Sequence, residues 1–270
     1  MMVSGARQVA ATDGTPIVFE TLGDGPNRIA LCHSLAMDRH FWKPIAERLA
    51  EEATVILWDA RGHGESGRPA GPYGVELFAD DLASVLDALG WPSAIVGGAS
   101  MGGCVSLAFA GRHAGRLQGL GLFDTTAWYG PSAVEDWAQR AEKARSDGLP
   151  GLVEFQLTRW FTERFRKSQP DVVERCVRIF LDNDTNAYAE SCLMLGRADL
   201  RALLPGIDVP VQIAVGEEDY ATPPAMAKAL RDGIAGAELE IIEQGRHLTP
   251  LEHPDRIAEH LRRIIERRQP

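Results

Sequence analysis

A serine set among glycines limits how this chain can fold more than any other feature. The stretch IVGGASMGG, residues 95–103, joins a short apolar run to a helical pattern. Its core, Gly98 to Gly102, has the form Gly-x-Ser-x-Gly, which is typical of a sharp turn from a buried strand into a helix. Small residues two positions before and after Ser100 let the backbone fold back without side-chain clash. We expect the Ser100 hydroxyl to stand above a sheet, with the Met101 amide free at a helix N-terminus to hold an oxyanion.

Strand-like and helix-like patterns alternate on both sides of this turn. A hairpin is predicted over 9–20 around the turn dipeptide Asp13-Gly14. Short apolar runs typical of strands buried on both faces follow at 28–32, 54–58, 95–99, 117–123, 209–216 and 239–242. Patterns with helical spacing separate most of them. This order predicts an α/β fold: a mostly parallel eight-stranded sheet with helices on both faces.

The alternation is interrupted in the middle of the chain. Residues 128–204 contain no strand-like run, and their apolar residues recur at helical spacing. We predict a core domain formed by 1–127 and 205–270, with 128–204 inserted as a helical lid. Because sites in such sheets lie at the carboxyl ends of the strands, an insertion that leaves this edge would cover the site.

Composition and charge narrow the partners. The chain has 270 residues and a net charge of −10, which argues against nucleic acid or an anionic membrane as a partner. Its apolar runs are all shorter than the roughly 20 residues of a membrane span, and residues 1–12 lack the apolar segment of a signal peptide. The four cysteines form no C-x-x-C pair, so we expect reduced thiols and a cytoplasmic location rather than disulfides. Without a Cys/His cluster of ligand spacing, no metal or cofactor is predicted, and the oligomeric state stays open.

A serine needs a base that is neutral near pH 7, which points to histidine. Among the seven histidines, His247 is favoured because it follows a glycine just past the last predicted strand. Such a position brings it to the same edge of the sheet as Ser100. His33 is the competitor, because it follows another predicted strand on the side where the oxyanion would be held.

The base must in turn be oriented by a carboxylate. Asp219 lies in the turn after the predicted strand 209–216, and Asp124 ends the strand that follows the nucleophile helix. Glu217 and Glu218 also compete. The order serine, acid, histidine favours Asp219, whereas Asp124 has an alternative interpretation as a turn or capping residue.

Several of these segments together resemble the α/β-hydrolase superfamily over nearly the whole chain. The matching motifs, in order, are CHSL (32–35), DARGHGES (59–66), GASMGG (98–103), GEED (216–219) and GRH (245–247). Within the superfamily the chain is most similar to 3-oxoadipate enol-lactonases, through GPY (71–73) and, in the predicted lid, RWFT (159–162) and YAESC (188–192). The resemblance implies Asp219 as the acid and the Leu35 amide as the second oxyanion donor beside Met101.

The resemblance also points to residues that would shape the substrate pocket. His33 and Trp128 differ from what it would place at the strand ends, so both are candidates for substrate contact. In the lid, Trp137 and Trp160 either line the pocket or pack the lid core. Arg159 is either a counter-ion for a substrate carboxylate or a solvated side chain.

These residues predict a serine hydrolase that opens a small enol-lactone by acyl transfer through Ser100, His247 and Asp219. The motifs are shared with other lidded hydrolases, so a carboxylesterase, a C–C bond hydrolase and a perhydrolase stay open as alternatives. A ligand-binding receptor without turnover, built on the same fold, is the alternative from another class. In each case the predicted partner is a small molecule, an ester or lactone for the hydrolases.

Overall fold

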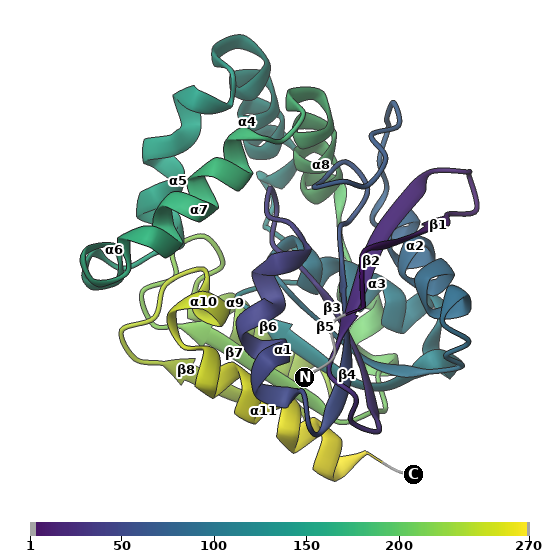
Figure 1. The fold of residues 1–270 in the computed structure, drawn as a ribbon. Helices are drawn as coiled ribbons and strands as arrows, with labels where there is room; N and C mark the ends of the chain where they lie inside the picture. Colours follow the sequence, from purple (N-terminus) through teal and green to yellow (C-terminus); the bar gives the residue numbers. More distant parts are fainter. Residues whose placement is uncertain (1–3, 269–270) are drawn as a thin grey trace.

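The computed structural model describes residues 4–268 and contains one eight-stranded sheet (Figure 1). The strand order is β1-β2-β4-β3-β5-β6-β7-β8. Strands β1 and β2 form the predicted hairpin, and β2 is antiparallel to β4; the strands from β3 to β8 are parallel to their neighbours. The bounds are β1 Arg7–Ala10, β2 Pro16–Leu22, β3 Asn27–Cys32, β4 Ala53–Trp58, β5 Ala94–Ala99, β6 Leu117–Phe123, β7 Val211–Gly216 and β8 Glu238–Ile242. The predicted mostly parallel eight-stranded sheet is confirmed.

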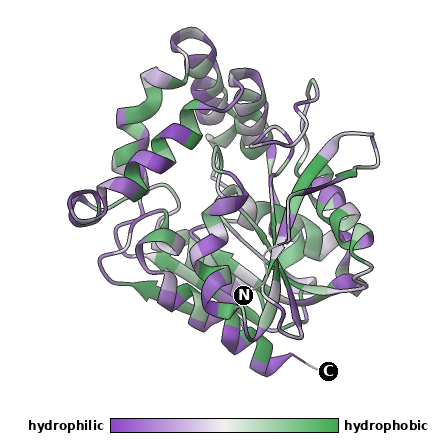
Figure 2. Ribbon diagram, in the orientation of Figure 1, coloured by the Kyte–Doolittle hydropathy of each residue, from purple (hydrophilic) through white to green (hydrophobic). Residues whose placement is uncertain are grey.

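Helices cover both faces of this sheet, which explains why the central strands are continuous apolar runs (Figures 1 and 2). Every residue of β5 and β7 is buried. Helices α1 (Lys43–Leu49) and α11 (Pro254–Arg267) pack together on one face, and α2 (Val75–Ala88) packs with α3 (Met101–Arg112) on the other. On α11 the buried residues Ile257, Leu261 and Ile264 recur at helical spacing and face the sheet. Helices α9 (Pro224–Gly233) and α10 (Thr249–Glu252) complete the core.

The segment between β6 and β7 forms a helical insertion at the top of Figure 1. Its helices are α4 Ala133–Asp147, α5 Val153–Trp160, α6 Glu163–Ser168, α7 Pro170–Leu181 and α8 Thr185–Arg197. Asn183 donates a hydrogen bond to the Ala36 carbonyl (3.0 Å), and the Leu248 amide donates to the Trp160 carbonyl (3.1 Å). Ala36 follows β3 and Leu248 follows β8, so these bonds attach the insertion to the carboxyl-terminal edge of the sheet.

Buried ion pairs hold the loop after β4 against this edge. Arg61 donates to both carboxylate oxygens of Asp81 (2.7 and 2.6 Å) and to Asp13 (2.8 Å). Asp59 accepts hydrogen bonds from the amide and guanidinium of Arg39. Removing one partner of such a buried pair would leave an uncompensated charge. These pairs therefore fix the loop after β4 in place at the edge of the sheet.

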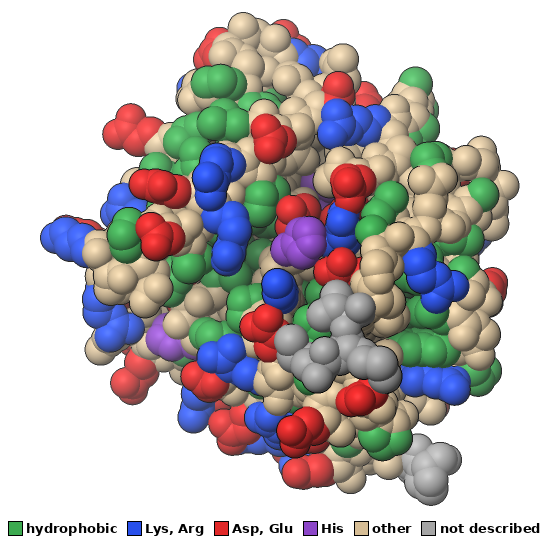
Figure 3. Space-filling view, viewed as in Figure 1, with side chains coloured by type: hydrophobic (Ala, Val, Ile, Leu, Met, Phe, Trp, Pro, Cys, Tyr) green, Lys and Arg blue, Asp and Glu red, His purple; other side chains and the backbone are tan. Residues whose placement is uncertain are grey.

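The surface carries both signs of charge. Acidic and basic side chains lie side by side on the face seen in Figure 3, without a broad patch of either sign there. Within residues 4–268, every helix is too short or too polar to cross a membrane. All four cysteines are buried free thiols.

Candidate active site

Ser100 occupies a strained turn between β5 and α3. Its backbone has φ 54° and ψ −116°, in the region that non-glycine residues avoid. The two glycines of the motif make this turn sterically allowed. A Cβ on Gly98 would collide with the carbonyl of Gly102, and a Cβ on Gly102 would collide with the carbonyl of Cys32. The spacing of Gly-x-Ser-x-Gly therefore follows from close backbone contacts, and these expose the Ser100 hydroxyl at the edge of the sheet.

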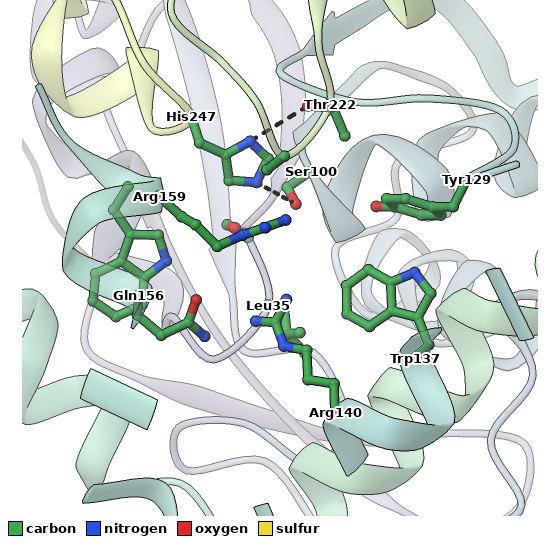
Figure 4. A pocket seen from close by; sticks show the side chains of 12 residues that line it. Leu35, Ser100, Tyr129, Trp137, Arg140, Gln156, Arg159, Thr222 and His247 are labelled. Carbon is green, nitrogen blue, oxygen red and sulfur yellow. Dashed lines mark hydrogen bonds between the residues drawn. The ribbon is translucent and has the colours of Figure 1, made fainter. Parts of the chain in front are cut away.

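The structure brings His247 to this serine, as Figure 4 shows, and places Asp219 behind the histidine. His247 Nε2 lies 2.9 Å from Ser100 Oγ, and His247 Nδ1 lies 2.8 Å from Asp219 Oδ2. Asp219 is fixed in turn by the amides of Ala221 and Thr222 and by the Thr222 hydroxyl (2.7, 3.0 and 2.8 Å). These contacts assign the Nδ1 proton to the side facing Asp219 and leave Nε2 as the acceptor for the serine hydroxyl.

The same contacts keep Asp219 charged. Burial alone would raise its pKa, but the charge and hydrogen bond of His247, together with the bonds from Thr222, outweigh burial and the net pKa is lowered. A carboxylate that stays ionised beside Nδ1 can stabilise a positive charge on the His247 ring.

Asp124, the rival acid, lies in the same region but binds other groups. It accepts hydrogen bonds from the Gly216 amide (3.1 Å) and from the amide and hydroxyl of Thr249 (3.0 and 2.6 Å). Burial and the neighbouring charge of Asp219 raise its pKa. Asp124 therefore connects the end of β6 to the end of β7 and the start of α10. Glu217 and Glu218 are exposed, and Glu218 pairs with Arg246.

A small cavity opens in front of Ser100, between the sheet edge and the insertion (Figure 4). It includes the predicted residues Leu35, Trp137, Arg159 and Trp160. The full lining is Ser34, Leu35, Ser100, Tyr129, Trp137, Arg140, Gln156, Arg159, Trp160, Ala221, Thr222 and His247.

Two backbone amides beside the serine are free to bind an oxyanion. Within residues 4–268 the Leu35 amide meets no protein acceptor. Met101 is the first residue of α3, so its amide has no intrahelical partner and carries the partial positive charge of a helix N-terminus.

Two arginines of the insertion extend into the cavity. Arg140 donates to the Tyr188 hydroxyl (2.7 Å), and its guanidinium lies 4.8 Å from the centre of the Trp137 ring. The guanidinium of Arg159 lies 4.9 Å from the ring centre of Phe155. In the described part of the chain neither arginine pairs with a carboxylate. Burial and the positive charge of Arg140 lower the pKa of Arg159, so the pair favours an anion in the cavity.

The aromatic candidates divide between the cavity and the surface. Trp137 and Trp160 line the cavity, and Trp160 also packs edge-on against Phe180. Trp128 does not line it. Its ring is covered by the guanidinium of Arg201 at 3.8 Å, and its backbone bridges to Asp199. The prediction of substrate contact by Trp128 is therefore corrected: this residue packs at the base of the insertion.

The prediction that His33 contacts the substrate is also corrected. It is fully buried and absent from the cavity lining. Its Nδ1 bonds to the Ser34 carbonyl (2.8 Å), and its Nε2 accepts from the Ala60 amide (3.0 Å). With both ring nitrogens occupied by backbone groups, His33 connects the loops after β3 and β4 and positions the Leu35 amide. It does not contact the substrate cavity.

The ring of His63 lies 5.1 Å from that of His33, which gives a pH-dependent prediction. Burial, then the charge of His33, lowers the pKa of His63 from 6.5 to about 3. The folded state thus holds His63 neutral while the unfolded state binds a proton below pH 6.5, so this histidine reduces stability as pH falls from 6.5 towards 3 by about 1.4 kcal/mol per pH unit. The free energy of unfolding can be measured with urea at several pH values between about 6 and 5. Its slope against pH gives the number of protons taken up on unfolding, and this number is expected to be about one smaller in His63→Gln than in the wild type. Equal slopes would contradict a neutral buried His63.

Sequence reasoning missed six lining residues: Ser34, Tyr129, Arg140, Gln156, Ala221 and Thr222. Arg140 follows Trp137 by three positions on α4, so helical spacing places both on one face and could have indicated it. Thr222 follows the predicted acid by three residues and bonds to it. For Tyr129 and Gln156 the sequence carried no signal, since their positions depend on how the insertion packs.

Comparison with known proteins agrees with this fold and site. A family model described as "alpha/beta hydrolase fold" matches residues 27–254. The chain therefore belongs to the α/β-hydrolase family. It is 30% identical over 235 residues to 3-oxoadipate enol-lactonase 2 of Acinetobacter baylyi. The aligned region covers 87% of this chain and 87% of that protein. It is 29% identical over 255 residues to a pimeloyl-[acyl-carrier protein] methyl ester esterase of Neisseria meningitidis, covering 92% of this chain and 96% of that protein.

Among solved structures, the enol-lactonase from Burkholderia xenovorans LB400 aligns with a TM-score of 0.91 and 32% sequence identity. The alignment covers 96% of this chain and 100% of the enol-lactonase chain. The resemblance to enol-lactonases noted from the motifs is thereby confirmed over nearly the full length. Because a methyl ester esterase is almost as similar, the comparisons define the hydrolase class more firmly than the substrate.

Proposed function

We propose that the chain is a serine hydrolase that opens a small enol-lactone carrying a carboxylate, of the type of 3-oxoadipate enol-lactone. The observation that carries this proposal is a pair of arginines, Arg140 and Arg159, that lie in the same small cavity as Ser100 and pair with no carboxylate among residues 4–268. Arginine binds carboxylates through a planar fork of donors, and a half-buried guanidinium without a carboxylate partner favours an anionic ligand. The similarity to enol-lactonases supports the same assignment.

The reaction proceeds in two acyl-transfer steps. His247 Nε2 accepts the Ser100 proton as the hydroxyl oxygen attacks the lactone carbonyl, and the Leu35 and Met101 amides bind the resulting oxyanion. When the ring C–O bond breaks, the proton passes from His247 to the enol oxygen. The enol becomes a ketone while the acid end stays bonded to Ser100. A water molecule, deprotonated by His247, then releases the oxoacid and restores the serine.

This proposal predicts a selective role for the arginines. Arg159→Met and Arg140→Met keep the length of the side chain but remove its charge. Each is expected to lower kcat/KM for the carboxylate-bearing enol-lactone about 10- to 100-fold, because a charge-assisted hydrogen bond is worth roughly 1.5–3 kcal/mol. The rate with an uncharged aryl ester of similar size is expected to change little. Steady-state kinetics on both substrates measures the difference.

Arg164→Met serves as the control, because Arg164 is exposed on α6 and away from the cavity. It is expected to leave both rates unchanged. If the arginine variants slow the lactone and the neutral ester equally, the arginines do not recognise a carboxylate. If the wild type hydrolyses aryl esters and leaves the lactone intact, a carboxylesterase takes the place of the lactonase.

A further inference from the structure

A single buried hydroxyl, that of Tyr188, bonds to two polar side chains of the cavity at Ser100. The Tyr188 oxygen accepts hydrogen bonds from Arg140 Nε (2.7 Å) and from Gln156 Nε2 (3.3 Å). Both of these side chains line the cavity and point into it (Figure 4). Tyr188 lies behind them on α8, and none of the described residues 185–197 of that helix lines the cavity. A ligand would therefore sense Tyr188 only through the side chains that it holds.

The bond at Nε leaves the outer part of the Arg140 guanidinium available. Arginine has five N–H donors, one of them at Nε and the others on the two Nη atoms. Within residues 4–268, the Nη atoms of Arg140 donate to no protein acceptor. The Trp137 ring, centred 4.8 Å from the guanidinium, lies against the same group, so the bond and the ring together limit its orientation. The two Nη groups are left as a fork of donors, which matches the two oxygens of a carboxylate.

Tyr188 is suited to hold an arginine that binds an anion, because it is uncharged and firmly packed. Burial raises the pKa of the Tyr188 phenol, so the hydroxyl stays protonated and leaves the positive charge of Arg140 uncompensated. The ring is fully buried and lies edge-on to Phe180 of α7, with 5.7 Å between the ring centres. A carboxylate side chain here would also hold the guanidinium, but its charge would cancel the attraction for an anionic ligand.

The segment YAESC (188–192), part of the resemblance to enol-lactonases, joins α8 to α4 at two points. Tyr188 bonds to Arg140 in the interior, and Glu190 Oε1 accepts a hydrogen bond from Arg145 Nη2 (2.9 Å) at the surface. We propose that Tyr188 is a positioning residue: its hydroxyl aims the donor fork of Arg140, so that α8 sets the preference for carboxylate-bearing ligands. The inference rests on the carboxylate recognition proposed above, but not on lactone turnover.

Adipate and its uncharged diamide, adipamide, test this inference as ligands of equal length. In a calorimetric titration, the wild type is expected to bind adipate more tightly than adipamide. Tyr188→Phe keeps the buried ring and removes only the hydroxyl. It is expected to weaken adipate binding about tenfold, because a hydrogen bond that orients a charged group is lost, and to leave adipamide binding within about twofold.

Three further variants separate the aim of the fork from helix packing. Arg140→Met has no fork, so adding Tyr188→Phe to it is expected to weaken adipate binding by less than about twofold. Glu190→Gln breaks the surface pair between the same two helices. Tyr73→Phe removes the hydroxyl of another buried tyrosine, which donates to the Pro69 carbonyl (2.9 Å) away from the cavity. Both of these controls are expected to keep the adipate affinity within about twofold of the wild type.

Kinetics supply a second measurement that loosened packing would not reproduce. On the enol-lactone, Tyr188→Phe is expected to raise KM about tenfold with kcat nearly unchanged, because a carboxylate away from the reacting carbonyl is bound equally in the ground and transition states. With the uncharged ester p-nitrophenyl acetate, both parameters are expected to stay within about twofold of the wild type.

The inference is overturned if Tyr188→Phe binds adipate as the wild type does, or weakens adipate and adipamide equally. It is also overturned if Glu190→Gln weakens adipate as much, or if Tyr188→Phe has its full effect without Arg140. A wild type that binds both ligands equally would refute carboxylate recognition, and the inference with it. Absence of lactone turnover beside the expected adipate pattern would refute the lactonase alone.

Discussion

Ser100→Ala is expected to abolish hydrolysis, with kcat lower by about five to six orders of magnitude. Ser100 Oγ is the atom that His247 Nε2 contacts at 2.9 Å, and its removal leaves no nucleophile for the acyl-enzyme. The oxyanion amides stay in place, so a residual acceleration over water of about a thousandfold is expected to persist. Initial rates on an ester that the wild type turns over measure the loss.

The fold of this variant is expected to be intact, because alanine replaces only a hydroxyl that bonds to His247. Ser106→Ala provides a control on the same helix. Ser106 is also buried, but its hydroxyl donates to the Gly102 carbonyl (2.8 Å). It is expected to keep nearly full activity. A Ser100→Ala protein that retained more than about 1% of the wild-type rate would contradict nucleophilic catalysis by this serine.

Replacing the two buried aspartates is expected to separate their roles. Asp219→Asn keeps the shape of the side chain but presents His247 Nδ1 with a neutral group and the wrong tautomer, so kcat is expected to fall about 10⁴-fold. Asp124→Asn leaves the contact between His247 and Asp219 untouched, because Asp124 bonds to Gly216 and Thr249. Its activity is expected to stay within about tenfold of the wild type, and its main effect is a stability loss of about 1–3 kcal/mol.

Activity and thermal unfolding measured on both variants separate these effects. Asp219→Asn is expected to unfold near the wild-type temperature despite its lost activity, and Asp124→Asn to unfold several degrees lower. The reverse pattern, with activity lost in Asp124→Asn and kept in Asp219→Asn, would make Asp124 the acid of the site.

The sequence was sufficient to predict the sheet because its central strands are buried on both faces. Such strands appear as continuous apolar runs, as in 94–99 and 211–216, and need no knowledge of their partners. The turn at Ser100 was equally visible, since its two glycines are required by contacts within a few residues and with one neighbouring strand. The order of Ser100, Asp219 and His247 followed from the same local patterns.

Side-chain environments set by distant segments were not predictable in this way. His33 follows β3, but its ring accepts a hydrogen bond from the Ala60 amide, 27 positions further along the chain. Trp128 lies at the start of the insertion, where Arg201 from its other end covers it. Tyr129 lines the cavity beside Trp137 of α4, a helix that packs against α8. Asp124 stayed a competing acid at the sequence level because only the structure shows that its carboxylate binds the Gly216 amide and Thr249.

The most direct test of the proposed chemistry is to mix the wild type with the enol-lactone, quench with acid within milliseconds, and measure the mass of the peptide that contains Ser100. Opening a lactone releases no fragment before hydrolysis, so the account predicts an adduct equal to the whole lactone mass on this peptide. Ser100→Ala is expected to show none. Lactone turnover that persists in Ser100→Ala, or an adduct on a different residue, would contradict acyl transfer through Ser100.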